Sequence, residues 1–235
     1  MKYLYNIQFK INLYKTGIND LDKLLFDTNK TGNLIEITGE KGAGKTQISL
    51  LICVICSLNN NRVVYSDNSW NFKPEKLKYM IDKFSEYKGN SKYFLKNIAY
   101  QRIYEVDDLP KLIKKIKIFD YNTLLLDDII PMFLYTYKEN IHLEVRKFIK
   151  EISFISLKKK ITIIYTNSIT EKIDSKSKKS YLKEPFNHDL IRYTHYKFRL
   201  QTNRSNSKII ECKLHYPYNM YNTKSKIDLR DLERY

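Results

Sequence analysis

The sequence predicts an α/β fold, with a mostly parallel central sheet flanked by helices and an antiparallel hairpin at one edge of the sheet. Three observations lead to this prediction. Short β-rich runs alternate with segments of helical periodicity along most of the chain. A glycine-rich turn joins the first such run directly to a helical segment. Near the end of the sequence, two runs of alternating polarity, 195–202 and 207–216, follow each other without a helical segment between them, as the strands of a hairpin do.

Each element of the alternation has its own local signal. The strands are short apolar runs rich in β-branched residues, and the helices repeat apolar residues every three or four positions. In the second helix, for example, Leu77, Ile81 and Phe84 share one face. Asp107 or Asp108 stands where an N-cap is expected for the third helix. The predicted strands span residues 33–38, 62–66, 98–103, 122–129 and 161–167, and the predicted helices span residues 46–58, 73–87, 107–119 and 142–157.

Length and composition favour one domain. A chain of 235 residues can bury a large core, and neither an internal repeat nor a linker divides it, so we expect a single domain over residues 1–235. No apolar run approaches the ~20 residues needed to cross a bilayer. The start of the sequence lacks the apolar stretch and cleavage site of a signal peptide, so we expect neither a membrane partner nor secretion. Cys53, Cys56 and Cys212 are interpreted as buried free thiols.

The chain is strongly basic. Lys and Arg total 42 against 26 Asp and Glu, which gives a net charge of +16. Such a charge favours an anionic partner, and nucleic acid is one of the candidates. The composition is also skewed towards Lys, Asn, Ile and Tyr, as an AT-rich coding sequence would produce, so the charge alone leaves DNA binding open.

The segment GEKGAGKT, residues 39–46, predicts a phosphate-binding loop. Three of the chain's 6 glycines fall inside it, between a strand and a helix, which is the context in which the G-x-x-x-x-G-K-[ST] pattern is specific. Glycines permit positive φ angles and close approach, so backbone N–H groups and the helix N-terminus can surround a phosphate. Lys45 is expected to reach the β- and γ-phosphate oxygens, and Thr46 to bind Mg²⁺. The alternative is a glycine turn without a ligand.

Together with an acidic residue further along the chain, this loop predicts a site for a nucleoside triphosphate and Mg²⁺. Asp127 follows a buried apolar strand and is expected to hold Mg²⁺ with Thr46, directly or through water. The alternative for Asp127 is a capping role after the strand. The predicted nucleotide-binding residues are Gly39, Glu40, Lys41, Gly42, Ala43, Gly44, Lys45, Thr46 and Gln47, and Lys45 is also assigned a catalytic role.

Several blocks of the sequence, in order, resemble the core ATPase domain of the RecA/RadA-type recombinases, which has a RecA-like P-loop NTPase fold. The blocks are TGINDLDKLL, TGNLIEITGEKGAGKTQISL, VVYSDNSWNFKPEKL, TLLLDDI, HLEVRKFIKEISFIS, ITIIYTNSIT and IIECKLH, and they cover roughly residues 15–215. The resemblance implies ATP and Mg²⁺ as cofactors and a role in homologous recombination and DNA repair. It implies DNA and another recombinase or paralog subunit as partners. The implied compartment is the nucleus in a eukaryote and the cytoplasm, at the nucleoid, in an archaeon.

Three departures from the family pattern bear on activity. The family places a water-activating glutamate after the second strand, in a pattern like D-T-E-G-x-F, but the turn DNSWNF has Ser69 there. Serine is no comparable base, and the loss of such a group costs ~10²–10⁴ in rate. The family's T-N-Q ending of the strand 161–167, whose glutamine senses the γ-phosphate, reads TNS with the shorter Ser168. We also expect neither a preceding helical DNA-binding domain nor an F-x-x-A polymerisation element, so the chain looks closer to RadB and the short paralogs than to a filament-forming recombinase.

Two further residues near the predicted site each have more than one possible role. Asp128 immediately follows the predicted magnesium ligand, where some P-loop ATPases carry a catalytic acid. A structural cap is the alternative that we favour, because successive strand residues point to opposite faces. Trp70 stands where the family has a small residue, and it could cover the nucleotide base, enter a partner's pocket or pack in the core.

The resemblance places two DNA-facing loops at residues 131–140 and 168–187. The second has no clear apolar periodicity and is expected to be exposed, with lysines and aromatics suited to sequence-independent, salt-dependent backbone binding. The alternative is a solvated loop in a lysine-rich chain. Arg146 is a weaker candidate that could instead pair with Glu144 or Glu151. The predicted DNA-binding residues are Lys172, Lys176, Lys178, Lys179, Tyr181 and Lys183.

The sequence therefore supports three hypotheses. The first is an ATP- and Mg²⁺-binding recombinase paralog that assists recombination through DNA or a partner recombinase, with slow hydrolysis or none. The second is a DNA-stimulated ATPase that acts directly in strand exchange, with Asp128 or a neighbour's residue replacing the glutamate. The third is a nucleotide-gated protein-interaction module without DNA contact. A steep dependence of DNA binding on salt would separate the third hypothesis from the other two.

Overall fold

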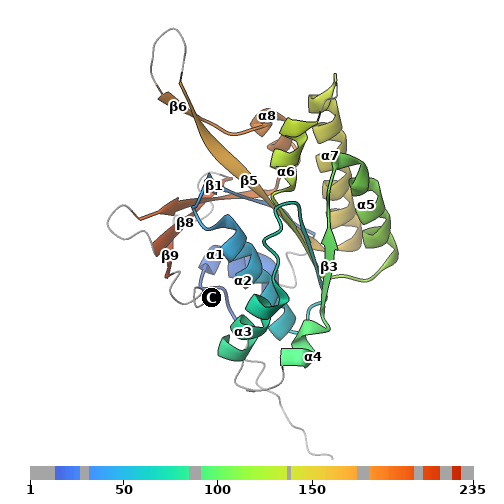
Figure 1. The fold of residues 1–235 in the computed structure, drawn as a ribbon, viewed down its shortest axis with the longest axis vertical. Helices are drawn as coiled ribbons and strands as arrows, with labels where there is room; N and C mark the ends of the chain where they lie inside the picture. Colours follow the sequence, from blue (N-terminus) through green and yellow to red (C-terminus); the bar gives the residue numbers. More distant parts are fainter. Residues whose placement is uncertain are drawn as a thin grey trace, which may run out of the picture.

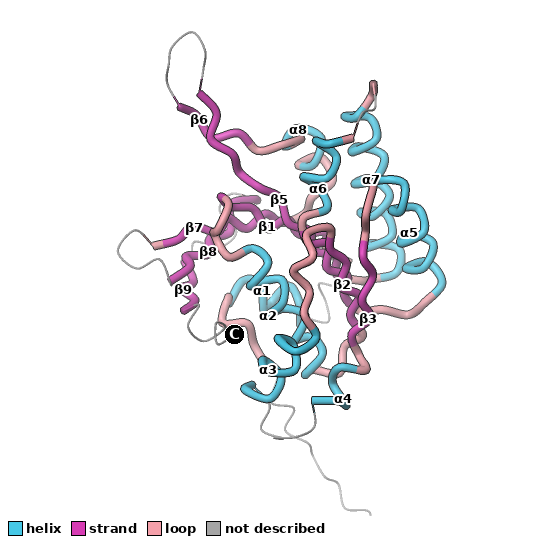
Figure 2. Tube along the Cα trace, viewed as in Figure 1, coloured by secondary structure: helices cyan, strands magenta, loops and turns pink. Residues whose placement is uncertain are grey.

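The fold is built on one large sheet. The computed structural model describes residues 14–26, 32–84, 91–136, 139–173, 180–203, 209–217 and 224–228. In these ranges the strands form a 9-stranded sheet in the order β3-β2-β4-β5-β1-β7-β8-β9, with β6 paired to the end of β5 (Figure 1, Figure 2). The strands are β1 (Leu34–Glu40), β2 (Val63–Asp67), β3 (Ile98–Arg102), β4 (Thr123–Asp127), β5 (Thr162–Ile173), β6 (Ser180–Lys183), β7 (Tyr196–Thr202), β8 (Ile209–Tyr216) and β9 (Lys224–Asp228).

The pairing directions confirm the predicted sheet. Neighbours from β3 to β7 are parallel, and β8 and β9 close one edge in antiparallel pairing. The predicted hairpin of β7 and β8 is present, and β9, which the sequence analysis did not predict, extends it by one strand. Because β1, β4 and β5 run parallel side by side, their carboxyl ends meet at one edge of the sheet. In α/β folds this is the edge where ligands bind.

Helices cover both faces of the sheet. Buried residues of α1, α2 and α3 share one core cluster, and those of α5, α6 and α7 share a second (Figure 1). The alternation of strand side chains separates the two clusters, since Leu125 of β4 joins the first and its neighbours Leu124 and Leu126 join the second. The helices are α1 (Asn19–Phe26), α2 (Lys45–Leu58), α3 (Pro74–Phe84), α4 (Ser91–Leu95), α5 (Leu109–Ile118), α6 (Ile129–Met132), α7 (Ile141–Lys159) and α8 (Asn187–Leu190), with 3₁₀ turns at Val106–Asp108 and Phe133–Tyr135.

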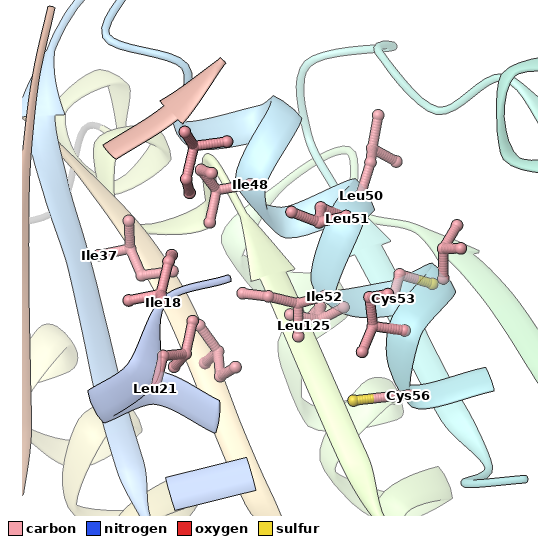
Figure 3. Close-up of a cluster of buried hydrophobic side chains, with 14 of the residues drawn as sticks. Ile18, Leu21, Ile37, Ile48, Leu50, Leu51, Ile52, Cys53, Cys56 and Leu125 are labelled. Atoms are coloured by element: carbon pink, nitrogen blue, oxygen red, sulfur yellow. The ribbon is translucent and has the colours of Figure 1, made fainter. Parts of the chain in front are cut away.

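Helix α2 is the most deeply buried of these helices along its length. Every residue from 48 to 58 is buried. Figure 3 shows Ile48, Ile52 and Cys56 of α2 within the first core cluster, near Leu125 of β4. This packing fixes the start of α2, and with it the glycine-rich turn before it, against the carboxyl edge of the sheet. The free cysteines are buried as predicted.

The segment after β5 corrects one expectation. We expected an exposed loop over residues 168–187, but β5 continues to Ile173 and pairs antiparallel with β6, with Thr170 opposite Lys183. The sequence from Ser168 to Ile173, SITEKI, has three consecutive polar residues between its two isoleucines, so it lacks the period of two that would have indicated a strand. Residues 174–179 lie outside the described ranges. The segment is therefore a β-hairpin that extends from the sheet (Figure 1).

Smaller differences concern helix ends. Asp108 precedes α5 as expected, but its side chain makes no cap bond and instead accepts a hydrogen bond from the backbone N–H of Tyr104 at 3.1 Å. Helices α1, α4, α6 and α8 were not predicted. Within the described ranges, no helix combines the length and the apolar character needed to cross a bilayer.

Candidate functional site

The segment GEKGAGKT forms a tight turn between β1 and α2. Gly42 and Gly44 have φ angles of 81° and 85°, in the left-handed region that glycine adopts readily. Gly39 is needed for space, because a Cβ built there would lie 2.9 Å from the backbone oxygen of Leu200 on β7. Gly44 is the N-cap of α2 and offers no side chain to the N–H groups of the first helical turn. The turn thus has the open, glycine-lined helix N-terminus that can bind a phosphate.

Lys45 opens α2, and its side chain folds back onto the turn. Its Nζ donates hydrogen bonds to the backbone oxygens of Gly39 and Glu40, both at 2.9 Å. Burial lowers the pKa of the Lys45 ammonium, and the carboxylates of Asp128 and Asp127 act against that shift. A cation held on the turn in this way is placed to meet the terminal phosphates of a nucleotide.

Asp127 ends β4 with a buried carboxylate. The Tyr65 hydroxyl donates to its Oδ2 at 3.0 Å, and the Thr166 hydroxyl donates to its Oδ1 at 2.9 Å. Burial raises the pKa of Asp127, while hydrogen bonds from Thr46, Thr166 and Tyr65 act against the increase. Thr46 and Asp127 therefore lie within hydrogen-bond reach of each other. A hydroxyl and a carboxylate at this spacing are hard oxygen donors of the kind that Mg²⁺ takes.

Asp128 does not continue the strand. Its φ angle is 59°, it occupies the N-cap position of α6 without a side-chain cap bond, and its N–H donates to Thr166 Oγ1 at 2.8 Å. Burial raises the pKa of the Asp128 carboxyl, with Lys45 acting against the shift and Asp67 adding to it. Strand alternation would direct this side chain away from the site. The left-handed turn changes that, and it brings the carboxylate within electrostatic reach of Lys45.

The turn after β2, where the family pattern has its glutamate, is organised by Asp67. Its Oδ2 accepts the N–H groups of Asn71 at 3.0 Å and Phe72 at 3.2 Å, and its Oδ1 accepts the Tyr100 hydroxyl at 2.7 Å. The Ser69 hydroxyl oxygen accepts a hydrogen bond from Asn71 Nδ2 at 2.8 Å. Ser69 is thus held within the turn itself.

Trp70 is 71% exposed, so the suggestion that it packs in the core is wrong. Its backbone has a φ angle of 62°, which is unusual for a bulky residue. The Trp70 ring lies against the guanidinium of Arg102, the last residue of β3, and meets the Tyr104 ring edge-on at a centroid distance of 6.4 Å. Its other two suggested roles, over a nucleotide base or in a partner's pocket, stay predictions.

The end of β5 adjoins the glycine turn. Ser168 is the register partner of Gly39, so the position at which the family has its glutamine lies beside the predicted phosphate site. The Ser168 N–H donates to Asn167 Oδ1 at 2.9 Å. Asn167 Nδ2 in turn donates to Glu36 Oε1 at 3.0 Å and to the backbone oxygen of Pro185 at 3.1 Å. The turn and the returning chain of the hairpin are therefore linked through β5.

The predicted DNA-binding residues lie on the hairpin. Lys172 on β5 and Tyr181 on β6 are register partners, and Lys183 is exposed at the end of β6. Lys176, Lys178 and Lys179 lie outside the described residues.

A buried ionic network at the base of the hairpin was not predicted from the sequence. Lys197 of β7 is 2% exposed and lies 3.3 Å from Glu36 Oε2, and it also contacts Glu184 and donates to Asn187 Oδ1 at 2.8 Å. Burial raises the pKa of Glu36, and Lys197 acts against that shift. A signal was available at Glu36, which is the one charge inside the β-rich run 33–38, whereas Lys197 shares its run with Arg199.

A mostly parallel sheet, a glycine turn after its first strand and an acidic residue at the end of a neighbouring strand define a RecA-like α/β domain. The family model of Rad51 matches residues 8–228. The chain belongs to the Rad51 family.

Individual relatives agree with this assignment. The chain is 27% identical over 185 residues to the DNA repair protein Rad51 homolog of Drosophila melanogaster, which covers 72% of the chain and 54% of that protein. It is 25% identical over 174 residues to the DNA repair protein RAD51 homolog 1 of Arabidopsis thaliana, which covers 68% of the chain and 50% of that protein. The chain thus spans about half the length of these curated relatives. The crystal structure of the RadB recombinase has the same fold, with a TM-score of 0.70 at 16% identity over 93% of this chain and 97% of that one.

Proposed function

We propose that this chain binds ATP and Mg²⁺ and acts as a recombinase paralog in homologous recombination and DNA repair, through DNA or a partner recombinase, with weak or absent ATP hydrolysis. The observation that carries the proposal is an intact phosphate turn with Lys45, Thr46 and Asp127 in a Rad51-family domain that has a serine where the family has its catalytic acid. Such a domain retains the parts for binding and lacks a part for turnover.

The residues of the turn fit a nucleotide with Mg²⁺. Gly39 lets the turn pack closely against β7, where a Cβ would lie 2.9 Å from the Leu200 backbone oxygen, and the helix N-terminus has no side-chain cap. Lys45 would bind the terminal phosphate oxygens in place of the backbone oxygens of Gly39 and Glu40 that it now contacts. Thr46 and Asp127 would hold Mg²⁺, which neutralises phosphate charge when bound. The remaining predicted members of the loop, Glu40, Lys41, Gly42, Ala43, Gly44 and Gln47, would contribute through their positions around the phosphates.

Slow hydrolysis follows from Ser69. The loss of a water-activating base lowers turnover by ~10²–10⁴, and the Ser69 hydroxyl is already engaged by Asn71. Ser168 is likewise shorter than the glutamine that it replaces in the family pattern.

Asp128 supports a second candidate function, a DNA-stimulated ATPase. Its left-handed backbone places the carboxyl near Lys45, and burial raises its pKa in the direction that makes a carboxylate a better proton acceptor. In this alternative Asp128 would orient or deprotonate the attacking water.

ATP turnover with and without single-stranded DNA separates the two candidates. The variants are Lys45→Ala and Asp128→Asn. The control is Asp120→Asn, which also removes one carboxylate, at an exposed position. We expect the protein to bind a fluorescent ATP analogue and the Lys45→Ala variant to lose this binding. We expect ATP turnover below about 10⁻² of that of an active family ATPase, because a water-activating base is missing. Turnover that disappears in Asp128→Asn but not in Asp120→Asn would replace the first candidate with the second. Failure to bind the nucleotide would refute both.

DNA contact is the other half of the proposal. Its support is the Rad51 family assignment, the net charge of +16 and the exposed Lys183 at the end of the hairpin. Backbone binding by lysines predicts an affinity that falls steeply with salt. A salt-independent interaction, or none, would favour a nucleotide-gated protein-interaction module.

A further inference from the structure

The turn after β2 and the chain after β3 enclose an arginine at one edge of the sheet. Strand β3 is the outermost strand on that side (Figure 1), and Arg102 is its last residue. The Arg102 guanidinium lies against the Trp70 ring, and its Cζ is 4.9 Å from the centroid of the Tyr104 ring. Trp70 is 71% exposed and Tyr104 is 67% exposed. We call these three residues the arginine–aromatic site.

The Arg102 guanidinium has no acceptor along one of its edges. Its Nε and Nη2 atoms are both enclosed, and neither has a hydrogen-bond partner among the described residues. Together these two atoms present the parallel N–H groups with which an arginine binds both oxygens of a planar carboxylate. Enclosed donors without an acceptor cost free energy. A ligand that supplied two acceptor oxygens would remove this cost.

The acidic residues closest to Arg102 along the strands and in sequence are already occupied. Asp67, its register partner on β2, accepts hydrogen bonds from two N–H groups of its own turn and from a tyrosine hydroxyl of β3. Asp108 accepts the Tyr104 N–H at 3.1 Å and pairs with Lys111. Neither carboxylate therefore serves the guanidinium.

Arg146 of α7 shows the arrangement that Arg102 lacks. Its Nε lies 3.0 Å from Asp189 Oδ1, so it pairs with this carboxylate rather than with Glu144 or Glu151. For Arg102 to be paired in the same way, the carboxylate would have to come from outside the described part of the chain.

The backbone of the arginine–aromatic site is held in place. Asn68 Nδ2 donates to the backbone oxygens of Ile103 at 3.0 Å and Tyr104 at 3.3 Å, which joins the turn after β2 to the chain after β3. Trp70 has a φ angle of 62°, and a bulky residue stays in this region only where its surroundings determine it. The indole ring itself is largely in solvent, and exposed side chains change rotamer readily. The ring is therefore the part that can move off the guanidinium.

We propose that the arginine–aromatic site binds a carboxylate side chain of a partner protein. Arg102 pairs with both carboxylate oxygens, and the Trp70 ring moves aside and packs, with Tyr104, on the apolar residues that flank the carboxylate. The proposal rests on the partner-binding part of the proposed function and adds the chemistry that the partner presents.

The composition of the site favours a protein over a nucleic acid. One planar cation matches the single charge and two oxygens of a carboxylate, whereas a chain of phosphates is bound by several cations. Tryptophan, tyrosine and arginine are the residues that contribute most of the binding energy at protein interfaces. At this site all three lie together, and the two aromatic rings are exposed.

The test uses Trp70 as a reporter, because it is the only tryptophan of the chain and it contacts Arg102. The probe is the pentapeptide GFEFG, capped at both ends, and the matched probe is GFQFG, which replaces the carboxylate with an amide. Tryptophan emission of the full chain is titrated with each peptide. Hydrogen bonds to a charged group are stronger than those to a neutral one, so we expect GFEFG to bind about 10-fold more tightly than GFQFG, or better.

Two variants assign the preference to Arg102. Arg102→Lys keeps the positive charge and removes the parallel donors. The matched control is Arg62→Lys, because Arg62 also lies over an aromatic ring, with its Cζ 5.5 Å from the Tyr121 centroid, next to the opposite end of β2. We expect the preference for GFEFG to fall below about 3-fold in Arg102→Lys, since a lysine makes no bidentate pair. Arg62→Lys should keep the preference of the wild type.

Each outcome decides a separate claim. Equal affinities of the wild type for the two peptides, or no binding of either, would refute the site even if Arg102→Lys failed to fold. A preference that survived in a folded Arg102→Lys would place the carboxylate elsewhere. If oligo(dT) changed the emission through Arg102 and the peptides did not, the partner would be a nucleic acid. The titration needs neither ATP nor DNA, so its failure would leave the proposed nucleotide and DNA binding standing.

Discussion

Tyr65 offers a sharp test of the proposed magnesium site. Its buried hydroxyl donates to Asp127 Oδ2 at 3.0 Å, so Tyr65→Phe deletes one hydrogen bond to an acidic side chain and leaves the ring in place. A hydrogen bond to a charged group contributes about 1.5–3 kcal/mol to stability. The same bond lowers the pKa of Asp127, and loss of a partner that orients a metal ligand weakens metal affinity about 10- to 100-fold. We expect Tyr65→Phe to lose both stability and Mg²⁺-dependent nucleotide affinity.

Tyr165→Phe is the matched control. Tyr165 is also buried, but its hydroxyl interacts with Thr194 Oγ1 at 2.5 Å and with the Glu36 carboxyl, and not with Asp127. Loss of these contacts should also cost about 1.5–3 kcal/mol, because one partner is acidic, and should leave Mg²⁺ dependence unchanged. The assay is titration of a fluorescent ATP analogue at several Mg²⁺ concentrations, with urea unfolding of both variants. If Tyr65→Phe needs no more Mg²⁺ than Tyr165→Phe, Asp127 does not hold the metal.

Two further predictions concern the turn and the response to acid. Gly39→Ala should lose about 1–3 kcal/mol in urea unfolding and weaken nucleotide binding, because its Cβ would lie 2.9 Å from the Leu200 backbone oxygen; an unchanged midpoint would contradict this close approach. His195 Nδ1 accepts the Leu34 N–H at 3.0 Å, and burial lowers the pKa of His195 below 6.5. The unfolded chain therefore takes up this proton first, so stability should fall as pH decreases from about 6.5 towards the lowered pKa, and thermal unfolding of His195→Gln over pH 7.5–5 should show a weaker dependence.

The order of strands and helices could be predicted because each central element has a strong local signal. Residues 124–126 are apolar and flanked by polar residues, and they form the centre of β4, which is buried on both faces. The glycine turn was equally clear, since its chemistry needs glycine at fixed spacings. The short helix α4 and the strand β9 were missed, because five residues carry too little periodicity to stand out.

The details of the site could not be predicted where tertiary contacts determine the backbone. Strand alternation directs Asp128 away from Asp127, and only the left-handed turn, with its N–H on Thr166, brings the side chain back towards Lys45. The ionic network of Lys197 and Glu36 likewise joins strands that are far apart in sequence. A charged residue in a β-rich run indicates such a partner without identifying it.

In the family pattern, one glutamine, at the position of Ser168, connects the phosphate site to the segment after β5. In this chain, other side chains connect the predicted phosphate site to the hairpin. Ser168, the shortened position, is the register partner of Gly39. Three residues before Gly39, Glu36 accepts a hydrogen bond from Asn167 and lies 3.3 Å from the Lys197 ammonium. These contacts are buried and continuous from β1 to the returning chain of the hairpin.

A continuous set of buried contacts gives a fixed position, but switching needs an element with two arrangements. Asn167 and Lys197 both hold the returning chain of the hairpin, at Pro185 and at Glu184 and Asn187. Opening this base would leave buried charges unpaired, which costs several kcal/mol. We therefore expect the base of the hairpin to keep its position when a nucleotide binds. Such a fixed base suits the proposed paralog with weak hydrolysis better than a protein whose hairpin moves in each cycle of hydrolysis.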